Sequence, residues 1–146
     1  MADAYLVDTG VFLRWFVDQP GSEHAQEIQE AFLNGRVQLE TADFARIEVA
    51  GVLRKKGLLS GRLTPEEFVS AVRVIDEFGV KVHQVDADRL EGAAALAVRL
   101  TLRMYDAVFA HLALARGIPL LTTDAKLCHA VEGVVETELL RGVTQS

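Results

Sequence analysis

Short apolar runs alternate with longer segments of helical periodicity along the chain, and this alternation restricts the fold more than any other feature of the sequence. The runs at residues 4–7 and 118–121 both lead into threonine and aspartate. Runs of this length suit buried strands better than helices. Because strands that alternate with helices are typical of parallel sheets, we predict an α/β fold with a mainly parallel central sheet.

The remaining elements follow from periodicity and from turn residues. The clearest helix start is Thr64-Pro65-Glu66-Glu67, where threonine can cap, proline suits the first turn and Glu67 completes a capping box. The predicted strands cover residues 4–7, 37–40, 80–85, 118–121 and 134–136. The predicted helices cover residues 9–17, 23–34, 43–56, 65–78, 86–100, 105–116 and 124–130.

Length and composition predict a single domain that spans residues 1–146. Half of the residues are hydrophobic and a quarter are charged, which allows a sizeable core and argues against disorder. No apolar run approaches the roughly 18 residues that a membrane helix needs, and the first residues lack the basic region of a secretory signal. The single cysteine, Cys128, cannot form an internal disulfide. We therefore expect a cytoplasmic protein without a membrane partner.

The acidic balance of the chain bears on nucleic-acid binding. The net charge is −6 and the pI is about 5.2, whereas nucleic-acid binding usually rests on lysine and arginine. Acids that cluster in one cleft can still bind divalent metals, and the metals then attract phosphate. The net charge therefore decides little until the acids are located.

Four of the 21 acidic residues do not fit solvated helix faces. Asp8 and Asp124 each follow a predicted strand, at the end where α/β folds gather ligands. Either residue could instead only cap the helix that follows it.

The other two acids lie on apolar helices. Glu48 projects between Phe44 and Val52, so we expect its side chain to be buried. A buried carboxylate needs a partner or a cation, and the basic residues Arg46, Arg54 and Lys55 are candidate partners. Asp106 is the only acid on the helix at 105–116, where the helix dipole alone could stabilise it.

The joint pattern predicts a cation site. If the four carboxylates converge, their repulsion requires a positive partner or raised pKa values. Mg²⁺ and Mn²⁺ favour carboxylate oxygens. Zinc is disfavoured because the four histidines and Cys128 form no ligand-like spacing.

Four segments of the chain resemble the motifs of the PIN-domain ribonucleases, and most closely those of the small VapC-type toxins of toxin–antitoxin pairs. The resemblance covers nearly the whole chain and keeps the order of the motifs. The segments are Leu6-Val7-Asp8-Thr9, Ala45-Arg46-Ile47-Glu48-Val49, Tyr105-Asp106-Ala107-Val108 and Leu121-Thr122-Thr123-Asp124.

This resemblance implies a three-layer αβα sandwich, commonly assembled as a homodimer. It implies an Mg²⁺- or Mn²⁺-dependent endoribonuclease that cleaves RNA phosphodiesters with metal-activated water. It also implies a cognate antitoxin, whose tail enters the acidic cleft. The residues that match the family's catalytic and metal-binding acids are Asp8, Glu48, Asp106 and Asp124. Thr122 matches a hydroxyl residue that orients the site, and Thr9 matches a less strict polar position.

Two other functions remain open from the sequence. The first is a PIN-like binding module that does not turn over. The second is a phosphatase with Asp8 as nucleophile, although the residues after Asp8 lack the further acid and the lysine of such enzymes. The RNA target is not determined. Four basic residues near the motifs could contact phosphates or lie as surface charges: Arg14, Arg46, Arg103 and Lys126.

Overall fold

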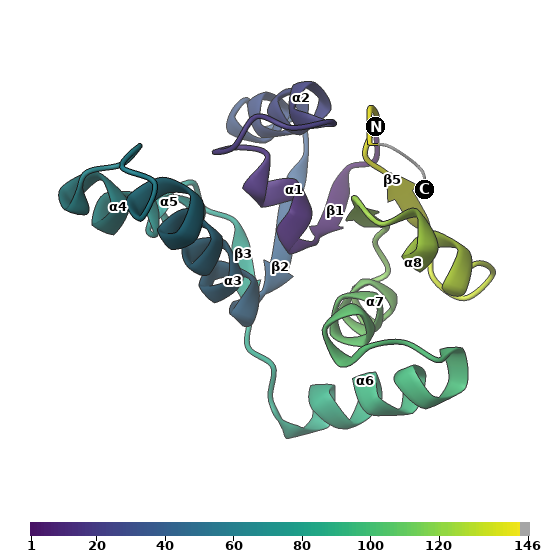
Figure 1. Ribbon diagram of the computed structural model, residues 1–146. Coiled ribbons are helices and arrows are strands. Elements are labelled where there is room, and N and C mark those ends of the chain that lie inside the picture. Colours follow the sequence, from purple (N-terminus) through teal and green to yellow (C-terminus); the bar gives the residue numbers. More distant parts are fainter. Residues whose placement is uncertain (144–146) are drawn as a thin grey trace.

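Five parallel strands form the centre of the structure, and helices cover both faces of the sheet (Figure 1). The computed structural model describes residues 1–143. The strands are β1 (Ala4–Val7), β2 (Gln38–Ala42), β3 (Lys81–His83), β4 (Leu120–Thr122) and β5 (Thr137–Leu139). Their order is β3-β2-β1-β4-β5. This arrangement confirms the predicted α/β fold with three layers and a parallel sheet.

The side chains of β1 alternate between two apolar cores, one on each face of the sheet. Tyr5 and Val7 pack into the first core with helices that precede β3 in the chain, whereas Leu6 packs into the second core mainly with helices that follow β3. All three side chains are fully buried, which explains why this strand is apolar at successive positions. The helices are α1 (Thr9–Leu13), α2 (Ser22–Leu33), α3 (Asp43–Leu53), a π-helical turn η1 (Arg54–Leu58), α4 (Pro65–Ala71), α5 (Val74–Glu77), α6 (Ala87–Leu100), α7 (Met104–Arg116) and α8 (Ala125–Ala130).

The last strand was predicted at the wrong residues. β5 covers Thr137–Leu139, so it begins three residues later than the predicted segment at 134–136. The backbone N–H groups of Val134 and Val135 bond to the carbonyl of Val131, in a turn after α8. Val135 is buried in the second core, so its apolar character reflects core packing and not strand pairing.

Three predicted helices are shorter than expected. The helix at 9–17 ends at Leu13 because the next N–H groups bond to carbonyls three residues back, which tightens the turns. The helix at 43–56 ends at Leu53 and continues as η1. The helix at 65–78 divides into α4 and α5, where the N–H of Arg73 bonds to Ser70. The capping box at Thr64 is present as predicted.

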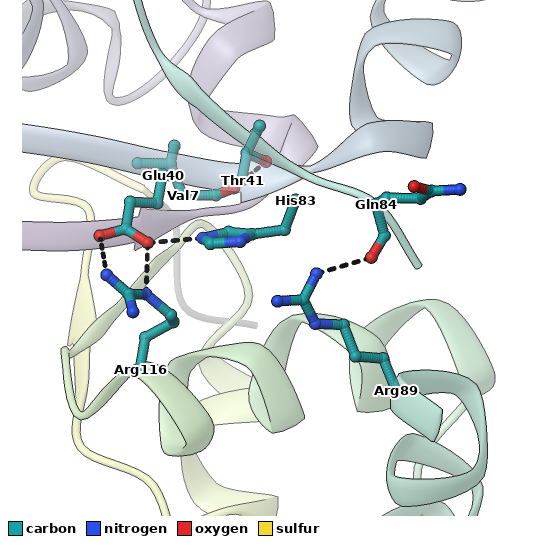
Figure 2. Close-up of polar contacts among 7 residues, drawn as sticks. All are labelled: Val7, Glu40, Thr41, His83, Gln84, Arg89 and Arg116. Atoms are coloured by element: carbon teal, nitrogen blue, oxygen red, sulfur yellow. Dashed lines mark hydrogen bonds and ion pairs between the residues drawn. The ribbon is translucent and has the colours of Figure 1, made fainter. Parts of the chain in front are cut away.

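A buried carboxylate ties α7 to the sheet (Figure 2). Glu40 lies on β2 and accepts hydrogen bonds from His83 Nε2 at 2.6 Å and from Arg116 Nε at 2.8 Å. Burial alone would raise the pKa of Glu40, but the hydrogen bonds from Arg116 and His83 outweigh burial and hold it below its ordinary value. This contact joins the C-terminal end of α7 to β2 and β3.

Glu40→Gln should lower the free energy of unfolding at neutral pH by about 1–3 kcal/mol, because the amide cannot replace two charge-assisted contacts. The loss of stability caused by Glu40→Gln should be smaller at acidic pH. A depressed pKa stabilises the fold above the ordinary value of 4.5, and this stabilisation is lost as the pH falls through the lower value in the fold. Urea unfolding measures both effects. Glu91→Gln, an exposed change on α6, serves as the control. Equal unfolding curves for the two variants would contradict this role for Glu40.

No helix within residues 1–143 has both the length and the apolar character that crossing a bilayer requires.

Candidate active site at the ends of β1 and β4

The candidate site lies where the connections of the sheet change direction. From β1 the chain passes to β2 and β3 on one side, and β4 and β5 lie on the other. In parallel α/β sheets a ligand crevice forms at the carboxyl ends of two such neighbouring strands. Asp8 follows β1 and Asp124 follows soon after β4, so the topology brings both acids to this crevice.

All four acids predicted from the sequence line one pocket, with a volume of about 270 Å³. The two helical acids come from α3 and the first turn of α7, on either side of the strand ends. The complete lining is Asp8, Thr9, Gly10, Glu48, Arg103, Tyr105, Asp106, Phe109, Thr123 and Asp124. The structure therefore brings the predicted acids together.

Asp8 is the most deeply buried of the four acids. Its Oδ1 accepts the backbone N–H of Val11 at 3.3 Å, which caps α1, and its Oδ2 accepts the hydroxyl of Thr122 at 2.5 Å. Burial raises the pKa of Asp8 from 3.8 to about 6, although hydrogen bonds from Thr122 and the backbone oppose the rise. The charge of Asp106 adds to the rise. The capping role considered for Asp8 is thus present together with its place in the pocket.

Thr122 connects the two strand-end acids. Its fully buried hydroxyl donates to Asp8 and accepts the backbone N–H of Asp124 at 3.1 Å. Asp124 in turn caps α8, because its Oδ1 accepts the N–H groups of Lys126 and Leu127. One hydroxyl thereby fixes the position of both acids.

Glu48 is half-buried, and the prediction of a buried side chain is wrong. Glu48 is the one residue of α3 in the described lining of the pocket, and its neighbour Ile47 is 74% exposed, so this helix is not enclosed on all sides. Glu48 accepts the hydroxyl of Thr9 at 2.7 Å. None of the basic residues considered as partners binds it within residues 1–143, and Arg46 pairs with Asp76 at 3.0 Å instead.

Asp106 lies in the first turn of α7 and is also partly exposed. Its Oδ2 lies 3.3 Å from Nε of Arg103, a side chain that is 82% exposed. An ion pair this exposed contributes little free energy. Asp106 can therefore exchange this partner for another cation at small cost.

The donor set fits a hard divalent cation. The pocket offers four carboxylates and several hydroxyls, and its described lining contains neither histidine nor cysteine. Such donors suit Mg²⁺ or Mn²⁺ better than zinc. No three acidic, histidine or cysteine side chains within residues 1–143 already stand together as a metal cluster. Cation binding by these acids stays a prediction.

The sequence did not single out some neighbours of the acids. Gly10 packs so closely against Thr123 that an added Cβ would clash with the side chain of that threonine unless one of the two shifted. Two aromatic residues, Tyr105 and Phe109, also line the pocket. Their spacing of four residues on an apolar helix was the available signal, but the same spacing is typical of core residues.

The four basic candidates near the motifs have different surroundings. Arg14 donates to the backbone carbonyls of Gly10 and Pro20, so its guanidinium holds the loop after α1. Of the four, only Arg103 lines the described pocket.

The phosphatase alternative finds no support in this geometry. An aspartyl nucleophile needs an activating group. No lysine occurs in the described lining of the pocket, so the activating lysine of such enzymes is not found beside Asp8.

The fold and the acidic pocket define the class of protein. The PIN domain family matches residues 5–133, which is most of the chain, and this chain belongs to that family. No curated protein matches the sequence.

Several solved structures share the fold. The toxin–antitoxin complex from Klebsiella pneumoniae superposes with a TM-score of 0.70 and 16% identity, over 95% of this chain and 99% of the other. VapC20 of Mycobacterium tuberculosis, a toxin that cleaves the sarcin–ricin loop, superposes with a TM-score of 0.67 and 20% identity, over 90% of this chain and 97% of the other. PAE2754 of Pyrobaculum aerophilum superposes with a TM-score of 0.62 and 22% identity, over 93% of this chain and 90% of the other.

Proposed function

We propose that this protein is an Mg²⁺- or Mn²⁺-dependent endoribonuclease and the toxin of a VapBC-type toxin–antitoxin pair. The observation that carries the proposal is the position of four carboxylates around one pocket, at the strand ends of a PIN domain. Structural similarity to toxins of such pairs supports the biological role. The sarcin–ricin-loop cleavage by VapC20 supports RNA as the substrate class.

Different residues of the chain would have different roles in the reaction. Asp8, Glu48, Asp106 and Asp124 would hold the cation through carboxylate oxygens. When bound, a divalent cation neutralises phosphate charge and lowers the pKa of water, which supplies the nucleophile for hydrolysis. Thr122 positions Asp8 and Asp124 through its hydroxyl. No nucleophilic side chain is needed.

The proposed partners follow from the same similarity. Several similar structures are toxin–antitoxin complexes, and some of these are bound to DNA. We propose that a cognate antitoxin covers the acidic pocket and that the protein forms a homodimer in the cytoplasm. Co-expression with the product of an adjacent small gene, followed by purification and sedimentation, tests both partners.

Asp106→Asn should lower the rate of RNA cleavage by at least about tenfold, because an amide binds divalent cations poorly. The assay uses structured and single-stranded RNAs with Mg²⁺ or Mn²⁺, and chelation with EDTA should stop the reaction. Asp88→Asn, an exposed change on α6, is the matched control and should keep full activity. Cleavage that survives chelation, or an Asp106→Asn variant as fast as the parent, would show that the proposed site is wrong.

A binding module without turnover is the second candidate. It is favoured by the hydrogen bonds and the ion pair that already provide each acid with a partner without a cation. A protein that binds Mn²⁺ by calorimetry yet leaves varied RNAs intact would support the module.

A further inference from the structure

Three aromatic rings lead from the second core to the rim of the acidic pocket. Phe109 is buried, Phe44 is half-buried and Tyr105 is 61% exposed. The centroid of Phe44 lies 5.0 Å from that of Phe109 and 5.1 Å from that of Tyr105. Phe44 comes from α3, whereas the other two rings come from α7 and line the pocket. The exposed ring therefore rests on a packed aromatic base.

The exposure of Tyr105 has no explanation in the stability of the fold. More than half of the side chain is open to solvent. Contact with Phe44 on one side restricts the ring while leaving much of it free. Asp106, one of the four pocket acids, is the next residue in the chain. A phosphate held at the acids would thus lie beside an exposed aromatic ring.

A nucleobase is the chemical group that fits this surface. Proteins that bind single-stranded RNA stack unpaired bases on exposed aromatic rings, and such stacking tolerates varied sequence. Basic side chains contribute little to holding a substrate here, because Arg103 is the one basic residue in the described lining, against four acids. Stacking would supply affinity that the pocket's charge does not.

We propose that Tyr105 binds the RNA substrate by stacking against an unpaired base next to the scissile phosphate. This inference rests on the proposed ribonuclease function, since it assigns the part of the substrate that the pocket rim holds. Contact with another protein is the competing explanation for the exposed ring, because Ile47 and Met104 are also exposed.

The test compares Tyr105→Leu with Tyr105→Phe on a single-stranded RNA that the parent protein cleaves. Tyr105→Leu should raise KM about 5- to 100-fold and change kcat less than about threefold, since stacking acts on binding. Tyr105→Phe should keep a KM near that of the parent. Val98→Ala, which changes an apolar side chain 84% exposed on α6, is the control and should change neither constant.

A second measurement does not depend on turnover. An RNA with a non-hydrolysable phosphonate linkage at the cleavage position carries 2-aminopurine on the adjacent nucleotide. Its fluorescence should be quenched by the parent and by Tyr105→Phe, but not by Tyr105→Leu at equal saturation. Thermal unfolding should show that all variants fold equally well.

The outcomes separate the two proposals. If the parent cleaves RNA but Tyr105→Leu keeps the parental KM and the parental quenching, the stacking role is wrong. The role is also overturned if Tyr105→Leu dissociates an oligomer in sedimentation, since the ring would then belong to a protein interface. If the parent cleaves no RNA, the ribonuclease function fails, and 2-aminopurine placed at successive positions of the RNA still reports whether a base stacks at Tyr105.

Discussion

Asp8→Asn is expected to slow RNA cleavage by at least about a thousandfold and to stabilise the metal-free protein at neutral pH. Asparagine keeps the size of the side chain and an oxygen that can accept a hydrogen bond from Val11 or Thr122. It removes the buried charge and with it an anionic ligand for Mg²⁺ or Mn²⁺. Loss of a central ligand should cost more than the ten- to hundredfold typical of supporting residues.

The stability effect should depend on pH with a definite sign. The pKa of Asp8 rises from 3.8 to about 6 in the fold, so the folded protein holds this proton more tightly than the unfolded chain. The resulting stabilisation is complete below the ordinary value and is lost as the pH rises through about 6. Above that pH the buried charge costs up to about 3 kcal/mol, at about 1.4 kcal/mol per pKa unit. Asp8→Asn removes this cost.

Urea unfolding in EDTA at about pH 7.5 and about pH 4.5 measures the effect. The free energy of unfolding of Asp8→Asn should exceed that of the parent at the higher pH and approach it at the lower pH. Asp88→Asn, on the exposed face of α6, controls for the loss of one negative charge. If Asp8→Asn were no more stable than the parent at neutral pH, the buried charge of Asp8 would not destabilise the fold.

Thr122→Val should reduce kcat/KM for RNA by about 10- to 100-fold, the range typical of groups that orient metal ligands. Valine matches threonine in shape but cannot donate to Asp8 or accept from Asp124. Without the hydroxyl, the pKa of Asp8 should rise further, because that hydrogen bond now opposes the effect of burial. The acidic limb of the pH–rate profile should therefore move to higher pH.

Two variants make the Thr122 result specific. Thr122→Ser keeps the hydroxyl and should recover most of the activity. Thr41→Val changes another fully buried threonine, whose hydroxyl donates to the carbonyl of Val7 at 2.7 Å (Figure 2). That control should lose stability without a shift in the pH–rate profile. A Thr41→Val profile that shifts as far as that of Thr122→Val would show a general effect of weakening the sheet.

Local patterns predicted most elements of the fold because the physics behind them is local. β1 occupies the predicted residues, and α6 and α7 lie within one residue of the predicted ranges. Apolar periodicity, an aspartate cap and a terminal glycine all act within a few residues. An error arose where packing between distant segments decided the outcome, as in the burial of Val135 in the second core.

The sequence by itself determined which four acids would line the candidate site, because strand-end positions and apolar helices make Asp8, Glu48, Asp106 and Asp124 unusual. Only the tertiary structure decided how these acids are held. Thr122 lies 114 residues from Asp8, and Glu40 lies 76 residues from Arg116, so no local pattern could pair them. The same holds for Tyr105, which shares a helix face with buried Phe109 yet lies at the open pocket rim. Periodicity shows which side chains share a face, whereas contacts between distant segments decide whether that face meets a core, a partner or solvent.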